Sequence, residues 1–124
     1  MKTFLAIYLG DAKSPNREAW DKLSETDQKK RMDAGLKAWY AWGDKHKAAI
    51  VVNGAPLGKT KRANKGGIAD TKNNMTGYVV VQADNHEAAA RMFENHPHFA
   101  IFPGDSVEIM ECLPIPGASE AQQS

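Results

Sequence analysis

Four stretches of the chain carry the hydrophobic pattern of β-strands. Three are predominantly apolar runs, typical of buried strands, at residues 3–9, 50–52 and 76–83, and the second of them is entirely β-branched. The fourth, residues 106–113, alternates apolar and polar positions imperfectly and is ended by Pro114. These runs predict four strands separated by segments of a different period.

Two of the intervening segments have the period of an amphipathic helix. The first begins at Ser24, a candidate N-cap with Asp27 three residues on. Its expected buried face consists of Met32, Leu36, Trp39, Gly43 and His46. The second is expected to be capped by Asp84, with Glu87 as the capping-box partner, and to stop before Pro97.

Residues 58–74 are polar and rich in Lys and Gly, so the sequence predicts either a loop or an irregular hairpin there. The order strand, helix, strand, strand, helix, strand is typical of a ferredoxin-like βαββαβ arrangement. The expected fold class is therefore α+β, with an antiparallel sheet covered by helices on one face. One domain is expected over residues 1–116, followed by a flexible C-terminal tail at 117–124.

The strand pattern also predicts a homodimer. Residues 78–81 are all apolar, and successive side chains of a strand point to opposite faces of the sheet. Two helices cover one face only, so the other face would expose an apolar patch that a monomer rarely tolerates. A second copy of the chain is the expected cover.

Composition narrows the class of protein. The chain has 124 residues with a net charge of +1, which gives no reason to expect nucleic acid or a membrane as a partner. Its single cysteine, Cys112, excludes an internal disulfide and is expected to be a buried thiol in the last strand. No apolar run is typical of a signal peptide or a membrane span, and a cytoplasmic location is expected.

Two glycine-rich or basic segments invite a functional interpretation. Residues 54–60 read GAPLGKT, but Asn53 stands where a phosphate-binding loop needs its first glycine and Pro56 removes an N–H group, which favours an ordinary turn. The basic run that follows is interpreted as a solvated loop, with a lid that attracts an anionic ligand as the alternative. Its members are Lys59, Lys61, Arg62 and Lys65.

The histidines and aromatic residues are candidates for a binding site. His96-Pro97-His98 has no Cys, Asp or Glu cluster nearby, so no metal site and no cofactor are predicted. His96 is interpreted either as a protonated residue at a helix C-terminus or as a pocket residue. Trp39 is interpreted as a core or interface residue, with ligand stacking as the alternative.

Several segments resemble the YCII-like family, including its branch with an Asp-Gly-Pro-Phe signature. They are residues 50–57 (IVVNGAPL), 66–72 (GGIADTK), 77–81 (GYVVV), 83–84, 87–94, 96–97 and 107–109. The resemblance extends over most of residues 3–114 and implies a dimeric α+β barrel, in which two ferredoxin-like sheets pack face to face. It also implies, for some members, acid–base chemistry by a His–Asp pair with the His on the first helix.

This chain departs from that pattern in two places. Residues 65–68 read Lys-Gly-Gly-Ile where the signature would fall, and the first helix has no His before His46. The proposed catalytic pair is therefore not carried over.

The expected function is the binding of a small polar metabolite in a cleft between sheet and helices. The alternatives are an acid–base enzyme (a lyase, isomerase or hydrolase) and a structural or partner-binding module. The candidate ligand-binding residues are His96, Trp39, Asp70 and Tyr78.

Overall fold

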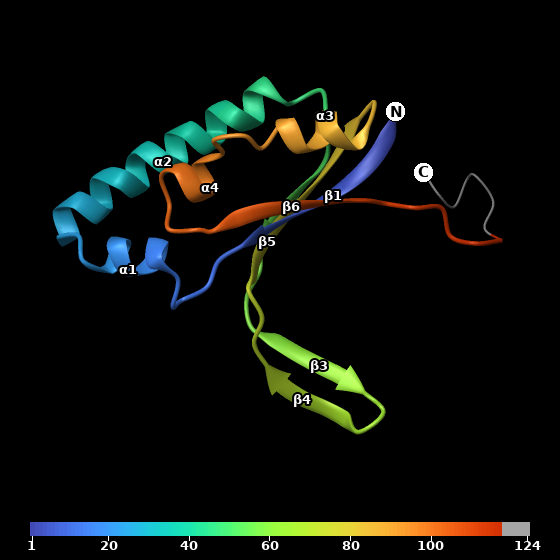
Figure 1. Cartoon of the computed structure of the whole chain (residues 1–124), viewed down its shortest axis with the longest axis horizontal. Coiled ribbons are helices and arrows are strands. Elements are labelled where there is room, and N and C mark those ends of the chain that lie inside the picture. Colours follow the sequence, from blue (N-terminus) through green and yellow to red (C-terminus); the bar gives the residue numbers. More distant parts are fainter. Residues whose placement is uncertain (118–124) are drawn as a thin grey trace.

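The computed structural model describes residues 1–117, so the predicted tail lies, apart from Gly117, outside the described residues. Strands and helices follow one another along the chain as shown in Figure 1. Their bounds are β1 (Lys2–Leu9), α1 (Pro15–Asp21), α2 (Glu25–Lys45), β2 (Ile50–Pro56), β3 (Thr60–Asn64), β4 (Gly67–Thr71), β5 (Met75–Ala83), α3 (His86–Arg91), α4 (Pro97–Ala100) and β6 (Ser106–Glu111).

The main sheet has four strands in the order β2-β5-β1-β6, and all neighbouring strands are antiparallel. With α2 and α3 as the two crossovers, this is the ferredoxin-like βαββαβ topology, and the predicted α+β fold is confirmed. The helices lie together on one side of the sheet (Figure 1). Within residues 1–117, no helix lies on the opposite side of the sheet.

Alternation along the strands separates a core face from an open face. The core face is the one under the helices, and its fully or nearly buried residues are Phe4, Ala6, Tyr8, Val79, Val81 and Ala83. The paired register places the intervening residues on the open face, for example Leu5 opposite Val80 and Ile7 opposite Tyr78. That face therefore has apolar side chains without a covering layer.

Helix α2 meets the core through part of the predicted face: Trp39 packs against the core as predicted, but Met32 and Leu36 do not. Met32 and Leu36 are 47% and 48% exposed, whereas Gly35 is the buried residue of the helix. The ring of Phe102 occupies the space beside Gly35, where an added Cβ would lie 2.5 Å from it. The packed face is therefore rotated toward Gly35, and the missing side chain allows the close approach.

Three local predictions have clear outcomes. Ser24 caps α2 as predicted, since its hydroxyl accepts from the Asp27 N–H. The cap of α3 is Asn85 and not Asp84, because Asn85 is the extended residue before the helix and its side chain accepts from the Ala88 N–H at 2.8 Å. The prediction of a buried thiol was wrong. Cys112 lies just beyond the end of β6 and is exposed.

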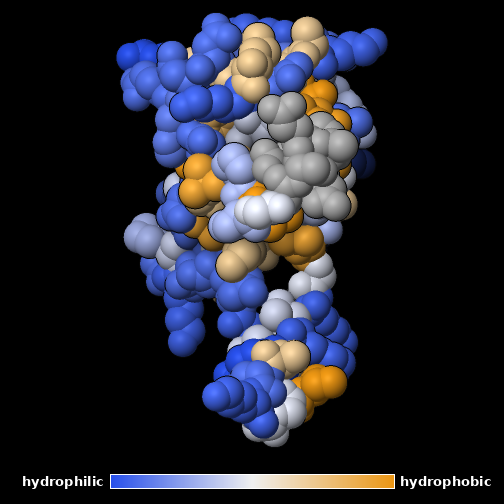
Figure 2. Space-filling model, turned by 90° about the vertical axis from the view of Figure 1, so that its right-hand side faces the viewer, coloured by the Kyte–Doolittle hydropathy of each residue, from blue (hydrophilic) through white to orange (hydrophobic). Residues whose placement is uncertain are grey.

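For residues 58–74 the sequence left a loop and a hairpin as alternatives. The structure has the hairpin, since β3 and β4 pair antiparallel. This hairpin projects away from the helical layer and stands apart from the body of the molecule (Figures 1 and 2). Its visible surface is largely hydrophilic with a small hydrophobic spot (Figure 2).

Within residues 1–117, none of the helices combines the length and the apolar character that crossing a membrane requires.

Candidate functional site

Aromatic rings surround His96 at the centre of the core. The ring centroid of His96 lies 4.6 Å from that of Trp39, 4.8 Å from that of Trp42 and 5.2 Å from that of Tyr8. The His96 side chain is completely buried. The predicted neighbourhood of Trp39 and His96 is thus present, but as part of the core rather than as the wall of an open cleft.

Both ring nitrogens of His96 have partners inside the protein. Its Nδ1 accepts the His98 backbone N–H at 3.0 Å, which makes His96 the N-cap of α4. A neutral ring that accepts at Nδ1 carries its proton on Nε2, which lies 3.5 Å from the Tyr8 hydroxyl oxygen. Burial, together with His98 and His46, lowers the pKa of His96 to about 3. The interpretation as a protonated residue at a helix C-terminus was therefore wrong.

His98 is largely buried, like His96, but it lies at the wall of a cavity. Its Nε2 lies 2.8 Å from the Leu9 carbonyl oxygen and donates to it, which leaves the lone pair of a neutral ring on Nδ1. His98 is 7% exposed, and no group within residues 1–117 forms a hydrogen bond with its Nδ1. Burial lowers the pKa of His98, while the Leu9 carbonyl and Asp105 act in the opposite direction.

His98 lines a cavity of about 320 Å³ at the end of β1. The remaining wall comes from the loop after β1, from α1, from the start of β5 and from the loop before β6. The wall residues beside His98 are Gly10, Asp11, Ala12, Arg17, Thr76, Phe102, Pro103 and Gly104. This volume is at the lower end of the range that small-molecule sites occupy. One part of the wall is charged and the other is apolar, which suits a small amphipathic or polar molecule.

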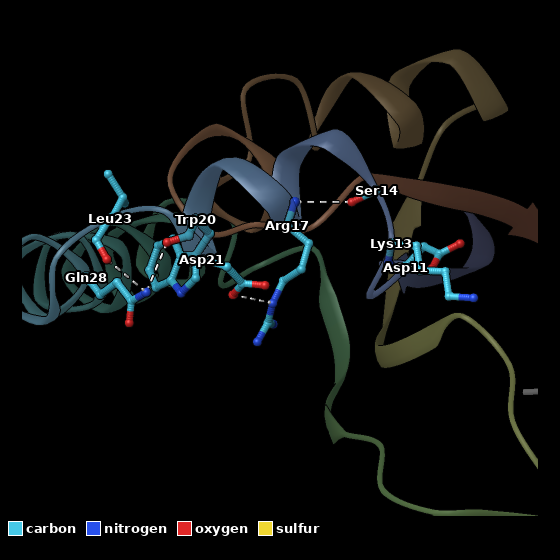
Figure 3. Close-up of polar contacts among 8 residues, drawn as sticks. All are labelled: Asp11, Lys13, Ser14, Arg17, Trp20, Asp21, Leu23 and Gln28. Carbon is cyan, nitrogen blue, oxygen red and sulfur yellow. Dashed lines mark hydrogen bonds and ion pairs between the residues drawn. The ribbon is translucent and has the colours of Figure 1, made fainter.

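The charged part of the wall is held by α1 and the turn before it (Figure 3). Ser14 caps α1 by accepting the Arg17 N–H, and the Arg17 Nε donates to the Asp21 carboxylate at 3.2 Å. The Asp11 carboxylate accepts the Lys13 N–H, and the Asp11 N–H donates to Asp105 at 2.9 Å. The guanidinium of Arg17 is thus oriented through Nε and can present its terminal nitrogens to an anion.

Gly104 is required for His98 to occupy this position. A Cβ built on Gly104 would lie 2.2 to 2.5 Å from three atoms of the His98 ring, closer than any real contact. The ring therefore lies directly against the backbone of the loop before β6. A glycine at this position is a local signal that a bulky ring lies against the chain.

A Gly104→Ala variant is expected to lose about 1–3 kcal/mol of unfolding free energy, because the methyl group forces the His98 ring to move. Urea denaturation monitored by circular dichroism measures the change. The control is Gly43→Ala in α2, where nothing lies within 4 Å of an added Cβ. That substitution should stabilise by about 0.5–1 kcal/mol, as removing a helical glycine does. Equal effects at both glycines would contradict the packing described.

The structure places the four predicted ligand-binding residues in three locations. His96 and Trp39 lie together in the core. Asp70 is exposed in β4 and forms an ion pair with Lys61 at 2.6 Å. Tyr78 lies on the open face of the sheet, opposite Ile7. Neither Asp70 nor Tyr78 approaches the His98 cavity, whose wall they do not share.

The residues that the sequence did not single out for ligand binding are Arg17 and His98. From the sequence, His98 was considered only together with His96, as a possible pair of metal ligands. Within residues 1–117, no group of three His, Cys, Asp or Glu side chains lies close enough together to hold a metal ion. His98 meets Leu9 across 89 positions of the chain, and such a contact has no local signal. The one local signal in the sequence is the pair Gly104-Asp105. In the folded loop Gly104 lies against the His98 ring, and Asp105 raises the pKa of that ring.

No family model matches the sequence, and no curated protein sequence matches it significantly. Among solved structures, the chain is similar to 5-chloro-2-hydroxyhydroquinone dehydrochlorinase (TftG) from Burkholderia phenoliruptrix AC1100, determined in complex with 2,5-dihydroxybenzoquinone. The TM-score is 0.49 at 21% sequence identity, over 87% of this chain and 90% of that chain. A likeness of this extent assigns neither a reaction nor a ligand to the present chain.

Proposed function

We propose that the chain binds a small polar molecule in the cavity beside His98. The observation that carries this proposal is a neutral imidazole with a free Nδ1 lone pair at the wall of a cavity that also contains Arg17. Nδ1 accepts a hydrogen bond from a ligand hydroxyl, and the guanidinium pairs with a carboxylate or another anionic group. A small hydroxylated carboxylate matches both groups.

Acid–base catalysis is the second candidate function, and the fixed tautomer of His98 favours it. Since Nε2 is bound to the Leu9 carbonyl, only Nδ1 is free to take a proton from a ligand. The imidazolium that forms is stabilised by that carbonyl and by nearby Asp105, the two groups that raise the pKa of His98. The proton then returns from Nδ1 to the product, so that His98 ends the cycle neutral.

A thermal-shift measurement with lactate, malate and 4-hydroxybenzoate tests the binding proposal. A ligand that binds the folded state raises the melting temperature by mass action, by several degrees when it is present far above its Kd. The increase should be lost in His98→Gln and in Arg17→Gln. It should persist in the control His86→Gln, whose imidazole is exposed and bonded to Ile109 away from the cavity. A shift that survives the loss of both cavity residues would place the ligand elsewhere.

We further propose that the chain forms a homodimer through its open sheet face. Apolar residues occupy this face on all four strands, and they are Leu5, Ile7, Val52, Tyr78, Val80 and Met110. Val52 and Met110 are 45% and 41% exposed in the single chain. At about 25 cal/mol per Å² of apolar surface, covering a few hundred Å² contributes several kcal/mol to association. A twofold axis would cover both copies at once.

The same proposal assigns the chain to the YCII-like proteins as one domain over residues 1–116. The support is the sequence resemblance together with the ferredoxin-like topology of the main sheet. A cytoplasmic location is proposed with it, because Cys112 is an exposed free thiol, and a reducing compartment keeps such a thiol unmodified.

A further inference from the structure

The β3–β4 hairpin is well specified by its sequence but has no cover within its own chain. Asn64 accepts the Gly66 N–H at 2.8 Å and Gly67 has a φ of 111°, so the turn chemistry fixes the reversal. All residues from 61 to 70 are nevertheless exposed, and Ile68 is exposed by 76%. A two-stranded ribbon alone is at best marginally stable in water. This ribbon therefore fits a role in which a second molecule covers it.

The charges of the main sheet bear on where such a second molecule would lie. Across its four strands only Lys2, Glu108 and Glu111 are charged. Lys2 and Glu111 form an ion pair at 3.7 Å, and Glu111 lies opposite Phe4 on the face under the helices. Glu108 lies opposite Ile7 and is therefore on the open face, where it joins no ion pair within residues 1–117. Among the residues of the four strands, it is the one charged side chain on the apolar face.

A dimer through this face brings the Glu108 carboxylate against a surface that has no cation of its own. A carboxylate taken out of water requires a cationic or hydrogen-bonding partner. The strands of a second sheet supply none, because their open faces carry no Lys or Arg. A concentration of positive charge is found on the hairpin with its flanks, which contains Lys59, Lys61, Arg62, Lys65 and Lys72.

Arg62 is the best placed of these cations. Lys61 is already paired with Asp70 across the hairpin. Arg62 is on the other face of the ribbon, opposite Ala69, so no carboxylate competes for it there. Its planar guanidinium binds a carboxylate through two parallel hydrogen bonds, which the ammonium of Lys cannot do.

We propose that the hairpin is an arm that embraces a second copy of this chain, with Arg62 of one subunit bound to Glu108 of the other. This inference rests on the proposed dimer and adds the element that sets its register. Twofold symmetry makes the contact twice, once in each direction. The hairpin projects away from the helical layer (Figure 1), so an arm reaching past the sheet does not meet its own helices.

A charge-swap experiment on the full chain tests the arm. Sedimentation velocity over a dilution series gives the dimer Kd for the native chain, Arg62→Glu, Glu108→Arg and the double variant. Each single reversal is expected to raise Kd by about tenfold or more, since it sets like charges against each other at both contacts. The double variant should return Kd to within about threefold of the native value, because the pair is restored with its sign exchanged. Lys37→Glu, on the exposed surface of α2, is the matched control.

The outcomes separate the arm from the dimer. The arm would be rejected if each single reversal changed the dimer Kd no more than Lys37→Glu does, or if the change in the double variant were the sum of the two single changes. Neither result would contradict the dimer itself. A native chain that stays monomeric at every concentration would reject both. Binding of a labelled DNA duplex that is lost in Arg62→Glu, with an unchanged dimer Kd, would make a polyanion the partner of the hairpin and would overturn the proposal.

Discussion

A Val80→Glu variant is expected to sediment as a folded monomer of 13.6 kDa at micromolar concentrations at which the native chain sediments at about twice that mass. Val80 lies on the open face of the inner strand β5, where it pairs with Leu5 on one side and Val52 on the other. A carboxylate at the centre of this apolar face would be desolvated without a partner, at a cost of several kcal/mol for each of its two copies.

Two controls make the Val80 experiment specific. Ala41→Glu adds the same charge at an exposed position of α2 and should leave the dimer intact. Val81→Glu places the charge in the core, where Val81 is completely buried, and should unfold the chain rather than dissociate it. Circular dichroism distinguishes the two outcomes. A native chain that remains a folded monomer at these concentrations would contradict the dimer.

The free energy of unfolding is expected to fall by about 1.4 kcal/mol for each pH unit below about pH 6.5, down toward pH 3, through His96 alone. Burial lowers the pKa of His96 in the folded chain to about 3, whereas the unfolded chain has the ordinary value of 6.5. Between these values the unfolded chain binds a proton that the folded chain does not. The stabilisation is thus complete above pH 6.5 and is lost as the pH falls. The lowered pKa of His98 acts in the same direction.

His96→Asn is the matched variant for the pH experiment. Asn still caps α4 with its side-chain oxygen but does not titrate. The variant should be less stable at pH 8, because it loses the ring packed against Trp39 and Trp42, yet its stability should depend less steeply on pH. Urea denaturation at a series of pH values measures both effects. Identical slopes for the native chain and the variant would mean that His96 titrates in the folded state near its ordinary pKa.

The four strands of the main sheet were predictable because their signal is local. Continuous apolar runs marked β1, β2 and β5, and the partly alternating run marked β6, so that the order of elements led directly to the topology. The hairpin at residues 58–74 was left open between two alternatives for a physical reason. Its shape depends on the Asn64 side chain and on a glycine with positive φ, and its strands have no buried face that a hydrophobic pattern could show.

The candidate site was less predictable, because it depends on which parts of the chain meet. Helix α3 stops before Pro97 as predicted, but Pro97 also begins the short helix α4, which was not predicted, and His96 is consequently an N-cap in the core. Asp70 and Tyr78 are chemically reasonable ligands, yet strand register places one on the projecting hairpin and the other on the open face. The His98 cavity is formed by segments far apart in sequence, so its charged residues could not be grouped in advance.

The most direct test of the proposed binding site is the imidazole spectrum of the folded chain, recorded by two-dimensional ¹⁵N–¹H NMR with and without the compound that gives the largest thermal shift. The structure predicts that neutral His98 carries its proton on Nε2, and that its Nδ1 resonance moves when the compound binds while both nitrogens of buried His96 stay unchanged. A proton on Nδ1 of His98, or a compound that perturbs His96 and leaves His98 unaffected, would contradict the site.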